Sequence, residues 1–532
     1  MFGAPQIVIT AAPREGRVSA PQRFVALRFV VTYLCMLSLV DLAAMLVVVV
    51  AHAASPATVA TTELAAMMYV LAGVSGAAVV LGLGYFLLAY PAHRKTILLL
   101  TLIVVGLLAA HLYTINLPDT ANCHDNTKDV DGCIMDEVYY VPAAQAMLSG
   151  EKCAPYADNC NLEHPFLSKA FIAAGIAIFG NGTFGWRIFE VLLGTFSIPV
   201  LFGICWAITK NERLSLYAAF LLAFETLFFV HSSIAVIDVS AIFFALLGFF
   251  FYFAKVQWWR FKPVTLAAIA LGVSALCKET SIMLFMVLVI YHVFFGEGSR
   301  EYRITTALEL TLLVFLVFAL GLQTYDSLLG AGTATNFIGQ ISFILSYGAS
   351  LTMTPSSRGW IDTVLKTPIT PLNWITYYSP VGYLITNVSV TAGSVAYSYV
   401  SAGYYGITNQ FEVWLTYFWG AYVVYLWRKT KGSLFESDSL LRDFKVGRLA
   451  LLWFLLVFLG YVGLYLYGRI TYPYYFIQAV PALAIGAAYF LTRGWFPRGI
   501  SYIVLAGVFL WFFIFYPDKS FLPDQVRVWL GH

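Results

Sequence analysis

The chain has 532 residues, of which 60% are hydrophobic and only 11% are charged. Because ordinary soluble domains carry about 25% charged residues, a surface this poor in charge is predicted to face lipid. The net charge of +3 is small, and the sequence contains no basic tract, zinc-finger spacing or Gly-rich phosphate loop. Nucleic acid is therefore excluded as an expected partner, and the lipid bilayer is the first partner that the composition predicts.

Long apolar runs dominate the chain from end to end. The predicted fold class is an all-α polytopic membrane protein, a bundle of about 13 transmembrane helices with two larger extracytoplasmic loops. The expected helices lie at about 24–52, 64–92, 96–115, 184–207, 214–230, 232–254, 263–277, 281–296, 305–323, 411–427, 449–468, 474–491 and 500–516. Residues 166–181 are less apolar and are expected to lie along the membrane interface.

The distribution of positive charge predicts the orientation of these helices. About two-thirds of the 31 Lys and Arg residues fall in links that are cytoplasmic if the N-terminus is inside. The predicted regions are a cytoplasmic tail (1–23), three helices that include an additional N-terminal pair (24–115), a first outer loop (116–183), a transmembrane core (184–323), a second outer loop (324–410), C-terminal helices (411–516) and a tail (517–532).

The seven cysteines divide into two groups. Three lie in apolar runs and are expected to be buried hydrophobic residues: Cys35, Cys205 and Cys277. Four lie in or beside the first outer loop: Cys123, Cys133, Cys153 and Cys160. A zinc site is the alternative for these four, but they contain no CxxC pair, so disulfides on an oxidising face are favoured. The sequence leaves the three possible pairings open.

Ionisable residues gather where the expected helices meet the outer face. They are Asp136, Glu137, Glu163, His164, Arg187, Asp238, Lys278, Glu279 and Arg469. Charged groups at a bilayer are costly, so this concentration predicts an amphipathic functional cavity. Asp238 is expected about one and a half turns inside its helix. His231 is expected in the short turn before that helix, and Glu225 at the outer end of the preceding one.

Structural roles compete with functional ones at several of these positions. Lys278 and Glu279 could cap helices or pair with each other. Arg187 could be an interfacial anchor, and His231 could be an ordinary loop histidine.

These residue types fit chemistry on a lipid-linked phosphate. An outer acid could act as a general base on a hydroxyl, while basic groups neutralise a phosphate. Glu163, His164 and Asp238 could instead hold a divalent metal ion on that phosphate, which is the one possible cofactor.

Several short motifs, in order, resemble one family. MDEVYY supplies an Asp-Glu pair, Asp136 and Glu137, early in the first outer loop. HPFLSK is similar to a His-Pro-Pro-Leu-Gly-Lys element, with Phe166 and Ser168 departing from it. The chain resembles a GT-C-fold glycosyltransferase of the protein O-mannosyltransferase family, related to the lipid A aminoarabinose transferases.

Further segments extend the resemblance over about residues 130–490. FGNGTFGWRIFEVLLGT places Arg187 in register, and LGVSALCKETS places Lys278. HSSIAVIDVS resembles a Ser-Arg-x-x-x-Leu-Asp element that supplies Asp238, although Ser233 replaces the arginine. YPYYFIQAVPALAI, which begins at Tyr472, resembles the family's late Tyr- and Pro-rich element.

The resemblance implies transfer of a sugar, most simply mannose, from a polyprenyl phosphate donor to Ser or Thr hydroxyls of a protein, with inversion. It implies that Asp136 is the base and that Glu137 orients the donor or acceptor. In the aminoarabinose branch an acid at the place of Glu163 helps to bind a metal. The candidate substrate-binding residues are Glu163, His164, Arg187, Asp238, Lys278, Glu279, Arg469 and Tyr472.

Three alternatives to this interpretation remain open. The same fold could transfer sugar to a lipid or a cell-wall glycan. A secondary transporter could use intramembrane charges to bind its substrate. A non-catalytic relative is suggested by the departures at Phe166, Ser168 and Ser233. No lumenal MIR domain is visible, which favours a prokaryotic plasma-membrane enzyme with its active site on the extracytoplasmic face.

Overall fold

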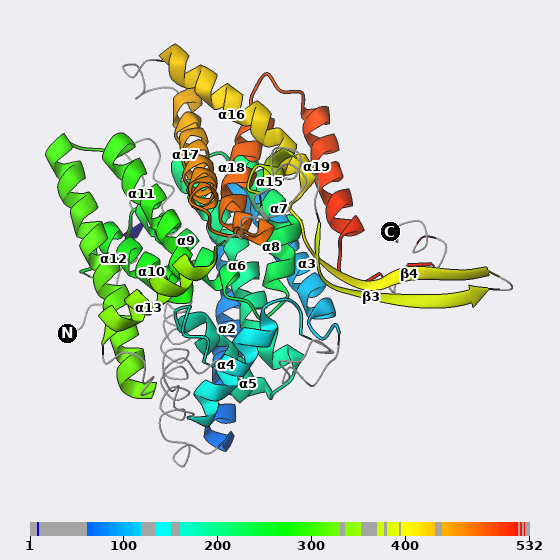
Figure 1. Cartoon of the computed structure of the whole chain (residues 1–532). Coiled ribbons are helices and arrows are strands. Elements are labelled where there is room, and N and C mark those ends of the chain that lie inside the picture. Colours follow the sequence, from blue (N-terminus) through cyan, green and yellow to red (C-terminus); the bar gives the residue numbers. More distant parts are fainter. Residues whose placement is uncertain are drawn as a thin grey trace.

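The computed structural model describes most of the chain in several stretches. These are residues 8–9, 61–118, 133–150, 160–258, 260–329, 336–352, 370–376, 380–392, 395–430, 439–519, 522–523 and 526. Within them the protein is a helical bundle from which one β-hairpin projects (Figure 1).

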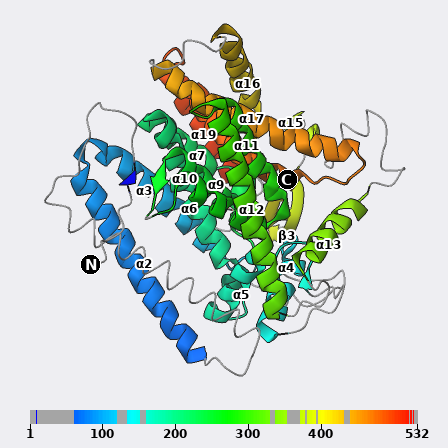
Figure 2. The same ribbon diagram turned by 90° about the vertical axis from the view of Figure 1, so that its left-hand side faces the viewer.

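The first half of the chain supplies the helices that surround the candidate site. They are α2 (Thr61–Ala89), η2 (Pro91–His93), α3 (Arg94–Thr114), α4 (Glu137–Ser149), α5 (Leu167–Phe179), α6 (Thr183–Thr209), α7 (Glu212–Ala223), α8 (Thr226–Ser232) and α9 (Asp238–Phe253). Figure 2 shows α2 slanting along one side of the bundle.

The second half adds the remaining helices and the hairpin. The helices are α10 (Pro263–Cys277), η4 (Glu279–Ser281), α11 (Ile282–Phe295), α12 (Arg300–Leu329), α13 (Phe337–Ser350), α15 (Asn373–Thr376), α16 (Gln410–Thr430), α17 (Ser439–Leu466), η6 (Pro473–Ala479), α18 (Val480–Leu491) and α19 (Arg498–Ile514). Strand β3 (Val381–Ala392) pairs antiparallel with β4 (Val395–Gly406), and the two-residue β1 (Val8–Ile9) pairs with β2 (Val256–Gln257).

Several helices have the length and composition to cross a membrane. In the described stretches these are five, at Pro91–Thr114, Thr183–Thr209, Arg300–Ser327, Phe444–Leu466 and Pro473–Leu491, or six if the bent pair α7–α8 is one span. Six more apolar helices are shorter than a full span. The helices therefore support an integral membrane protein, while the predicted count of 13 is not established. The helix expected at 24–52 lies outside the described residues.

The second outer loop contains regular structure that the sequence did not predict. Residues 324–410 were expected to form a second outer loop that folds against the outer face, with no strand named in it, in an all-α chain. The structure instead places the end of α12, helices α13 and α15 and the β3–β4 hairpin in this region. The expectation of an all-α chain is therefore wrong for the hairpin, although the fold is mainly helical.

The boundary between the two helices before the site also differs from the prediction. Glu225 is the N-cap of α8, and its side chain accepts a hydrogen bond from the backbone N–H of Phe228, where the chain bends by 62°. His231 therefore lies within α8, and Asp238 is the first residue of α9 rather than one and a half turns inside it. The apolar run hides this break, because only the capping carboxylate marks it.

Close helix packing forms the core behind the site. Helix α18 is central, since 94% of the apolar window at Pro473–Leu491 is buried. Helices α5 and α6 approach each other at Gly175 and Gly185, where a Cβ atom on either residue would collide with a backbone carbonyl oxygen. These contacts fix α5, and with it the turn that carries His164, against the transmembrane core.

Candidate active site

Asp136 occupies a turn that leads into α4. Met135 before it has φ = 56°, a left-handed conformation that a non-glycine residue rarely adopts and that is typical of constrained functional sites. The half-buried Asp136 side chain does not cap its helix and makes no hydrogen bond or ion pair with any residue that the structure describes. Burial raises the pKa of this carboxyl, while the positive charge of Lys278 opposes the increase.

Glu137, the next residue, is held on all sides. Its carboxylate forms a bidentate ion pair with Arg187 of α6, with the Nε–Oε1 distance at 2.7 Å and the Nη2–Oε2 distance at 2.8 Å. It also accepts hydrogen bonds from the backbone N–H groups of Ile134 and Ala235. Both side chains are fully buried, so this pair joins the Asp136 turn to α6 and to the segment before α9.

The other described contacts of the fully buried Arg187 guanidinium are also to protein groups. Its Nη1 atom donates to the carbonyl oxygens of Ile115 and Leu117, at 2.9 and 2.8 Å. The structure thus pairs Arg187 with Glu137, whereas the sequence analysis expected both to contact substrate. A bidentate buried pair of this kind has a fixed geometry, which suits it to positioning a neighbour.

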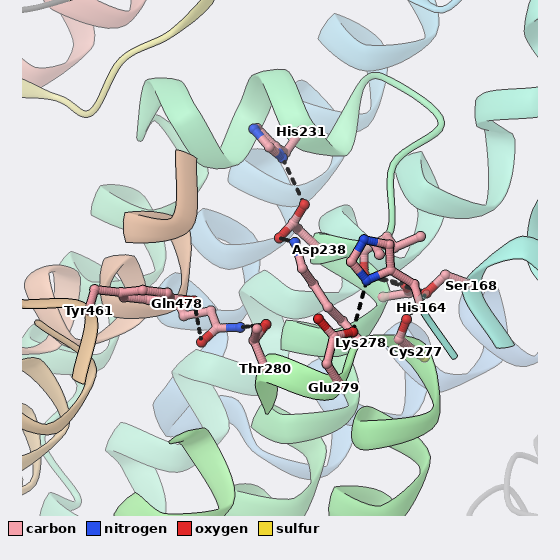
Figure 3. A network of polar contacts seen from close by, with 12 residues as sticks. His164, Ser168, His231, Asp238, Cys277, Lys278, Glu279, Thr280, Tyr461 and Gln478 are labelled. Atoms are coloured by element: carbon pink, nitrogen blue, oxygen red, sulfur yellow. Dashed lines mark hydrogen bonds and ion pairs between the residues drawn. The ribbon is translucent and has the colours of Figure 1, made fainter. Parts of the chain in front are cut away.

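Asp238 and Lys278 form the charged centre of the site. The Lys278 Nζ atom, at the C-terminal end of α10, lies 2.5 Å from Asp238 Oδ1 at the start of α9. The other carboxylate oxygen of Asp238 lies 3.5 Å from His231 Nδ1, and His231 Nε2 lies 2.9 Å from the Tyr383 hydroxyl of β3. Figure 3 shows His231, Asp238 and Lys278 pointing toward one another from three helical segments.

A second pair borders the first. His164 Nδ1, in the turn before α5, lies 2.9 Å from Glu279 Oε2 in η4 (Figure 3). Glu163 Oε1 accepts a hydrogen bond from the Asn161 side chain at 2.8 Å. Lys278 and Glu279 therefore do not pair with each other, because each has a partner on another element.

Lys169 fixes the turn that carries His164. Its fully buried Nζ atom donates to the backbone carbonyl oxygens of Asn161 and His164. Burial lowers the pKa of Lys169 to about 7, against the nearby charges of Glu163 and Glu279. This lysine from the HPFLSK motif is therefore a structural support under the site.

Tyrosines from η6 cover one side of Lys278. The Nζ atom lies 5.7 Å from the ring centre of Tyr474 and 5.6 Å from that of Tyr475. The Lys278 ammonium has three N–H donors, and one of them is directed at Asp238. Tyr472 stacks on Tyr474, whereas Arg469 donates from Nε to the Gly348 carbonyl oxygen at 2.8 Å.

The three candidate metal ligands are directed to different partners. Glu163 contacts Asn161, His164 contacts Glu279, and Asp238 contacts Lys278 and His231. Across the described ranges, no three His, Cys, Asp or Glu side chains are grouped as ligands for one metal ion. The described side chains thus do not assemble the predicted metal site.

The cysteines follow the predicted division as far as the structure describes them. Cys133 and Cys160 are each disulfide-bonded, which confirms the disulfide interpretation for these two. Cys205 and Cys277 are free and buried, as expected. Cys35, Cys123 and Cys153 lie outside the described residues. Cys133 is three residues before Asp136, so a covalent link restrains the turn that carries this acid.

Sequence reasoning missed two members of the site and undervalued a third. Tyr383 and Tyr474 come from segments where tyrosine is abundant, so nothing in the sequence distinguishes them. His231 was expected to be an ordinary loop histidine, yet it is fully buried beside Asp238. Its position in an otherwise apolar run, seven residues before an acid, was the available signal.

Residues 163–322 match the family model described as dolichyl-phosphate-mannose-protein mannosyltransferase. The resemblance to that family is confirmed over this segment. It includes His164, Arg187, Asp238 and Lys278, which the geometry above places in or directly around the site. Asp136 lies before the matched segment.

Curated relatives match a shorter stretch. The polyprenol-phosphate-mannose–protein mannosyltransferase of Mycobacterium tuberculosis is 31% identical over 116 residues, and that of Mycolicibacterium smegmatis is 28% identical over 116 residues. Each alignment covers 22% of this chain and 22% of the relative. The chain thus spans about a fifth of the length of the curated relatives that it matches.

A solved structure shares the fold over much more of the chain. The Saccharomyces cerevisiae protein O-mannosyltransferase Pmt1-Pmt2 complex, bound to the sugar donor, has a TM-score of 0.57 and 11% sequence identity. The likeness covers 80% of this chain and 90% of the yeast chain. At this identity it shows the fold alone, and that fold is the membrane helical architecture expected from the sequence.

Proposed function

We propose that the chain is a membrane glycosyltransferase that moves mannose from a polyprenyl phosphate to Ser or Thr hydroxyls of proteins. The observation that carries the proposal is the Asp136 carboxylate, which has no hydrogen-bond or ion-pair partner among the described residues and lies within electrostatic reach of the Lys278–Asp238 pair, in a chain whose segment 163–322 matches the mannosyltransferase family. The named activities of the mycobacterial relatives support the donor and the acceptor class.

Asp136 is the proposed general base because its carboxylate makes no hydrogen bond or ion pair with a described residue while it lies near Lys278 and Asp238. Glu137, its neighbour, is buried and fully paired. A raised pKa makes the Asp136 carboxylate a stronger base than an ordinary exposed one, provided that the pH keeps it ionised. In this proposal Glu137 and Arg187 position the turn and do not contact the substrate.

The reaction is a direct displacement at the anomeric carbon. Asp136 accepts the proton of the acceptor hydroxyl while the acceptor oxygen bonds to that carbon. The bond between the carbon and the phosphate oxygen breaks, and the polyprenyl phosphate leaves with the electron pair, so the configuration inverts. Lys278 is the proposed cation for the departing phosphate, since charge stabilisation at that oxygen is the main demand of the step.

The active site is proposed to lie on the extracytoplasmic face of a prokaryotic plasma membrane. The charge bias of the links and the disulfide-bonded Cys133 and Cys160 support this face, because disulfides persist in oxidising environments. The lipid tail of the donor would remain in the bilayer while its phosphate reaches Lys278.

The test uses purified protein, radiolabelled polyprenyl-phosphate mannose and a Ser/Thr-rich peptide. Label should appear in the peptide with the unchanged protein and should be lost with Asp136→Asn. Tyr139→Phe, an exposed change on the same helix, is the matched control and should retain activity. Turnover by a folded Asp136→Asn protein would overturn the assignment of the base.

Two further arms separate the alternatives. Label in a lipid or glycan with none in peptide would replace the protein acceptor with a glycolipid one. A parallel reaction with a chelator measures any metal requirement, independently of which side chains would hold the ion.

A further inference from the structure

The β3–β4 hairpin is the largest element that the proposed mechanism does not use. Its two strands of 12 residues pair only with each other among the described strands, so the outer edge of neither strand meets a further described strand. A strand of this length extends about 40 Å. Figure 1 shows the hairpin projecting from the helical bundle.

The composition of the hairpin leaves these edges unprotected. From Val381 to Gly406 the sequence VGYLITNVSVTAGSVAYSYVSAGYYG has no charged residue and no proline. Natural proteins blunt exposed edges with Lys, Pro or a covering element, because a bare edge pairs with other chains. A long edge without these features is suited to receive an extended strand.

The base of the hairpin is anchored to the bundle. The Tyr404 hydroxyl donates to the Leu117 carbonyl oxygen at 2.8 Å, and the Gly403 N–H donates to the Pro517 carbonyl oxygen at 2.8 Å. Tyr404 is fully buried. The hairpin is therefore fixed at its base, where the C-terminal segment already takes one donor on the outer edge of β4, and no described strand pairs with the outer edge of β3.

An irregularity in the ladder connects this base to the site. Gly382 pairs with Tyr405 and Leu384 pairs with Tyr404, so Tyr383 is the extra residue of a bulge. The Tyr383 hydroxyl lies 2.9 Å from His231, which in turn faces Asp238. Bulges near active sites redirect side chains, and here the bulge brings the hairpin base to the charged centre.

We propose that the outer edge of β3 is the docking site for the acceptor, an extended, Ser/Thr-containing segment of polypeptide that adds to β3 as a further strand. The proposal rests on the proposed function for the identity of the occupant. Main-chain hydrogen bonds would supply affinity with little sequence selectivity. The segment would continue from the edge to the hairpin base, where a hydroxyl reaches Asp136.

The first experiment shortens the hairpin and leaves its base intact. Residues 388–399 are replaced by an Asn-Gly turn, which closes the Asn387–Val400 pair and keeps both ladder irregularities. Fluorescence anisotropy then compares binding of an extended peptide of about 15 residues with binding of a Ser-containing tripeptide. The long peptide should bind about tenfold or more weakly to the shortened protein, and tripeptide binding should not change.

The second experiment changes the peptide and leaves the protein as it is. N-methylation of alternate backbone amides removes hydrogen-bond donors and keeps every side chain. It should weaken binding of the long peptide to the full chain and have no effect with the shortened chain. Equal affinity of methylated and unmethylated peptides for the full chain would overturn the proposal, whether or not the shortened chain folds.

Two measurements distinguish acceptor docking from the alternatives. If the edge pairs with a second copy of the chain, shortening the hairpin will lower the molecular mass measured by light scattering in detergent and will leave peptide affinity unchanged. That result would also overturn the docking proposal. Failure of the proposed function would show as absence of mannose transfer to either peptide, whereas the hairpin inference is decided by binding alone.

Discussion

The Glu137–Arg187 pair offers a sharp test of which acid acts on substrate. Glu137→Gln removes the negative partner and leaves the Arg187 guanidinium buried without a counter-charge. Removing one partner of a buried ion pair destabilises proteins by about 3–5 kcal/mol. Glu137 also accepts two backbone hydrogen bonds, so we expect a loss in that range.

The assay is unfolding in mixed micelles titrated with SDS and followed by tryptophan fluorescence. Glu137→Gln should move the midpoint to a clearly lower SDS fraction. Asp136→Asn should leave it unchanged or raise it, because that carboxylate is half-buried and has no partner among the described residues. The two substitutions would then have different effects: Glu137→Gln would lower stability, and Asp136→Asn would abolish transfer.

A double-mutant cycle completes this test. Glu137→Gln combined with Arg187→Met removes both charges, so the pair should show a coupling of about 2–3 kcal/mol. If Glu137→Gln unfolds like the unchanged protein and yet loses transfer, Glu137 contacts substrate and the positioning role assigned to it is wrong.

Three more predictions follow from charge and covalent restraint. Because burial and Asp238 raise the pKa of Asp136, kcat/KM should fall with decreasing pH above the range of an ordinary carboxyl. In Asp238→Asn the fall of kcat/KM should occur at lower pH, because one charge that raises the pKa of Asp136 is gone. A shift of this fall to higher pH would contradict the assignment of Asp136 as the base. Burial lowers the pKa of Lys169 from 10.5 to about 7, so between these values the unfolded chain binds more protons and stability should rise with pH. Lys169→Met should remove this rise of stability with pH, measured by SDS titration at several pH values. An unchanged rise would mean that a group other than Lys169 causes it. Reduction of the disulfide at Cys133 should lower transfer by loosening the Asp136 turn, measured with and without dithiothreitol; equal rates would show that the turn holds without it.

Residue type and spacing in the sequence identified several groups that the structure brings to the proposed site. Asp136 stood out because adjacent acids between long apolar runs are unusual, and the structure leaves its side chain available. The four clustered cysteines indicated disulfides because they contain no CxxC pair and lie in a loop predicted to be outside, and the two that are described are bonded. Lys278 and Asp238 stood out because charges beside a bilayer are costly.

The sequence does not show which of these charged side chains pair with one another. Glu137 and Arg187 are both charged residues near the same face, but only the path of the chain decides that they pair. The same holds for His164 with Glu279, from elements far apart in sequence. The hairpin was hidden because Ser, Thr, Gly and Tyr are as common in irregular loops as in exposed strands. The bend at Glu225 could not be predicted because hydropathy indicates which residues are buried and does not indicate where the helix axis changes direction.

The length of α9 sets how an acceptor can approach. Its 16 residues extend about 24 Å, less than the roughly 30 Å hydrocarbon core of a bilayer. If Phe253 lies at one interface, Asp238 is recessed below the other, inside the helical bundle. A hydroxyl on an extended chain can enter such a recess more readily than one on the flat surface of a folded domain. The proposed transfer would then favour Ser and Thr in extended or unfolded segments of its acceptor over those on flat folded surfaces.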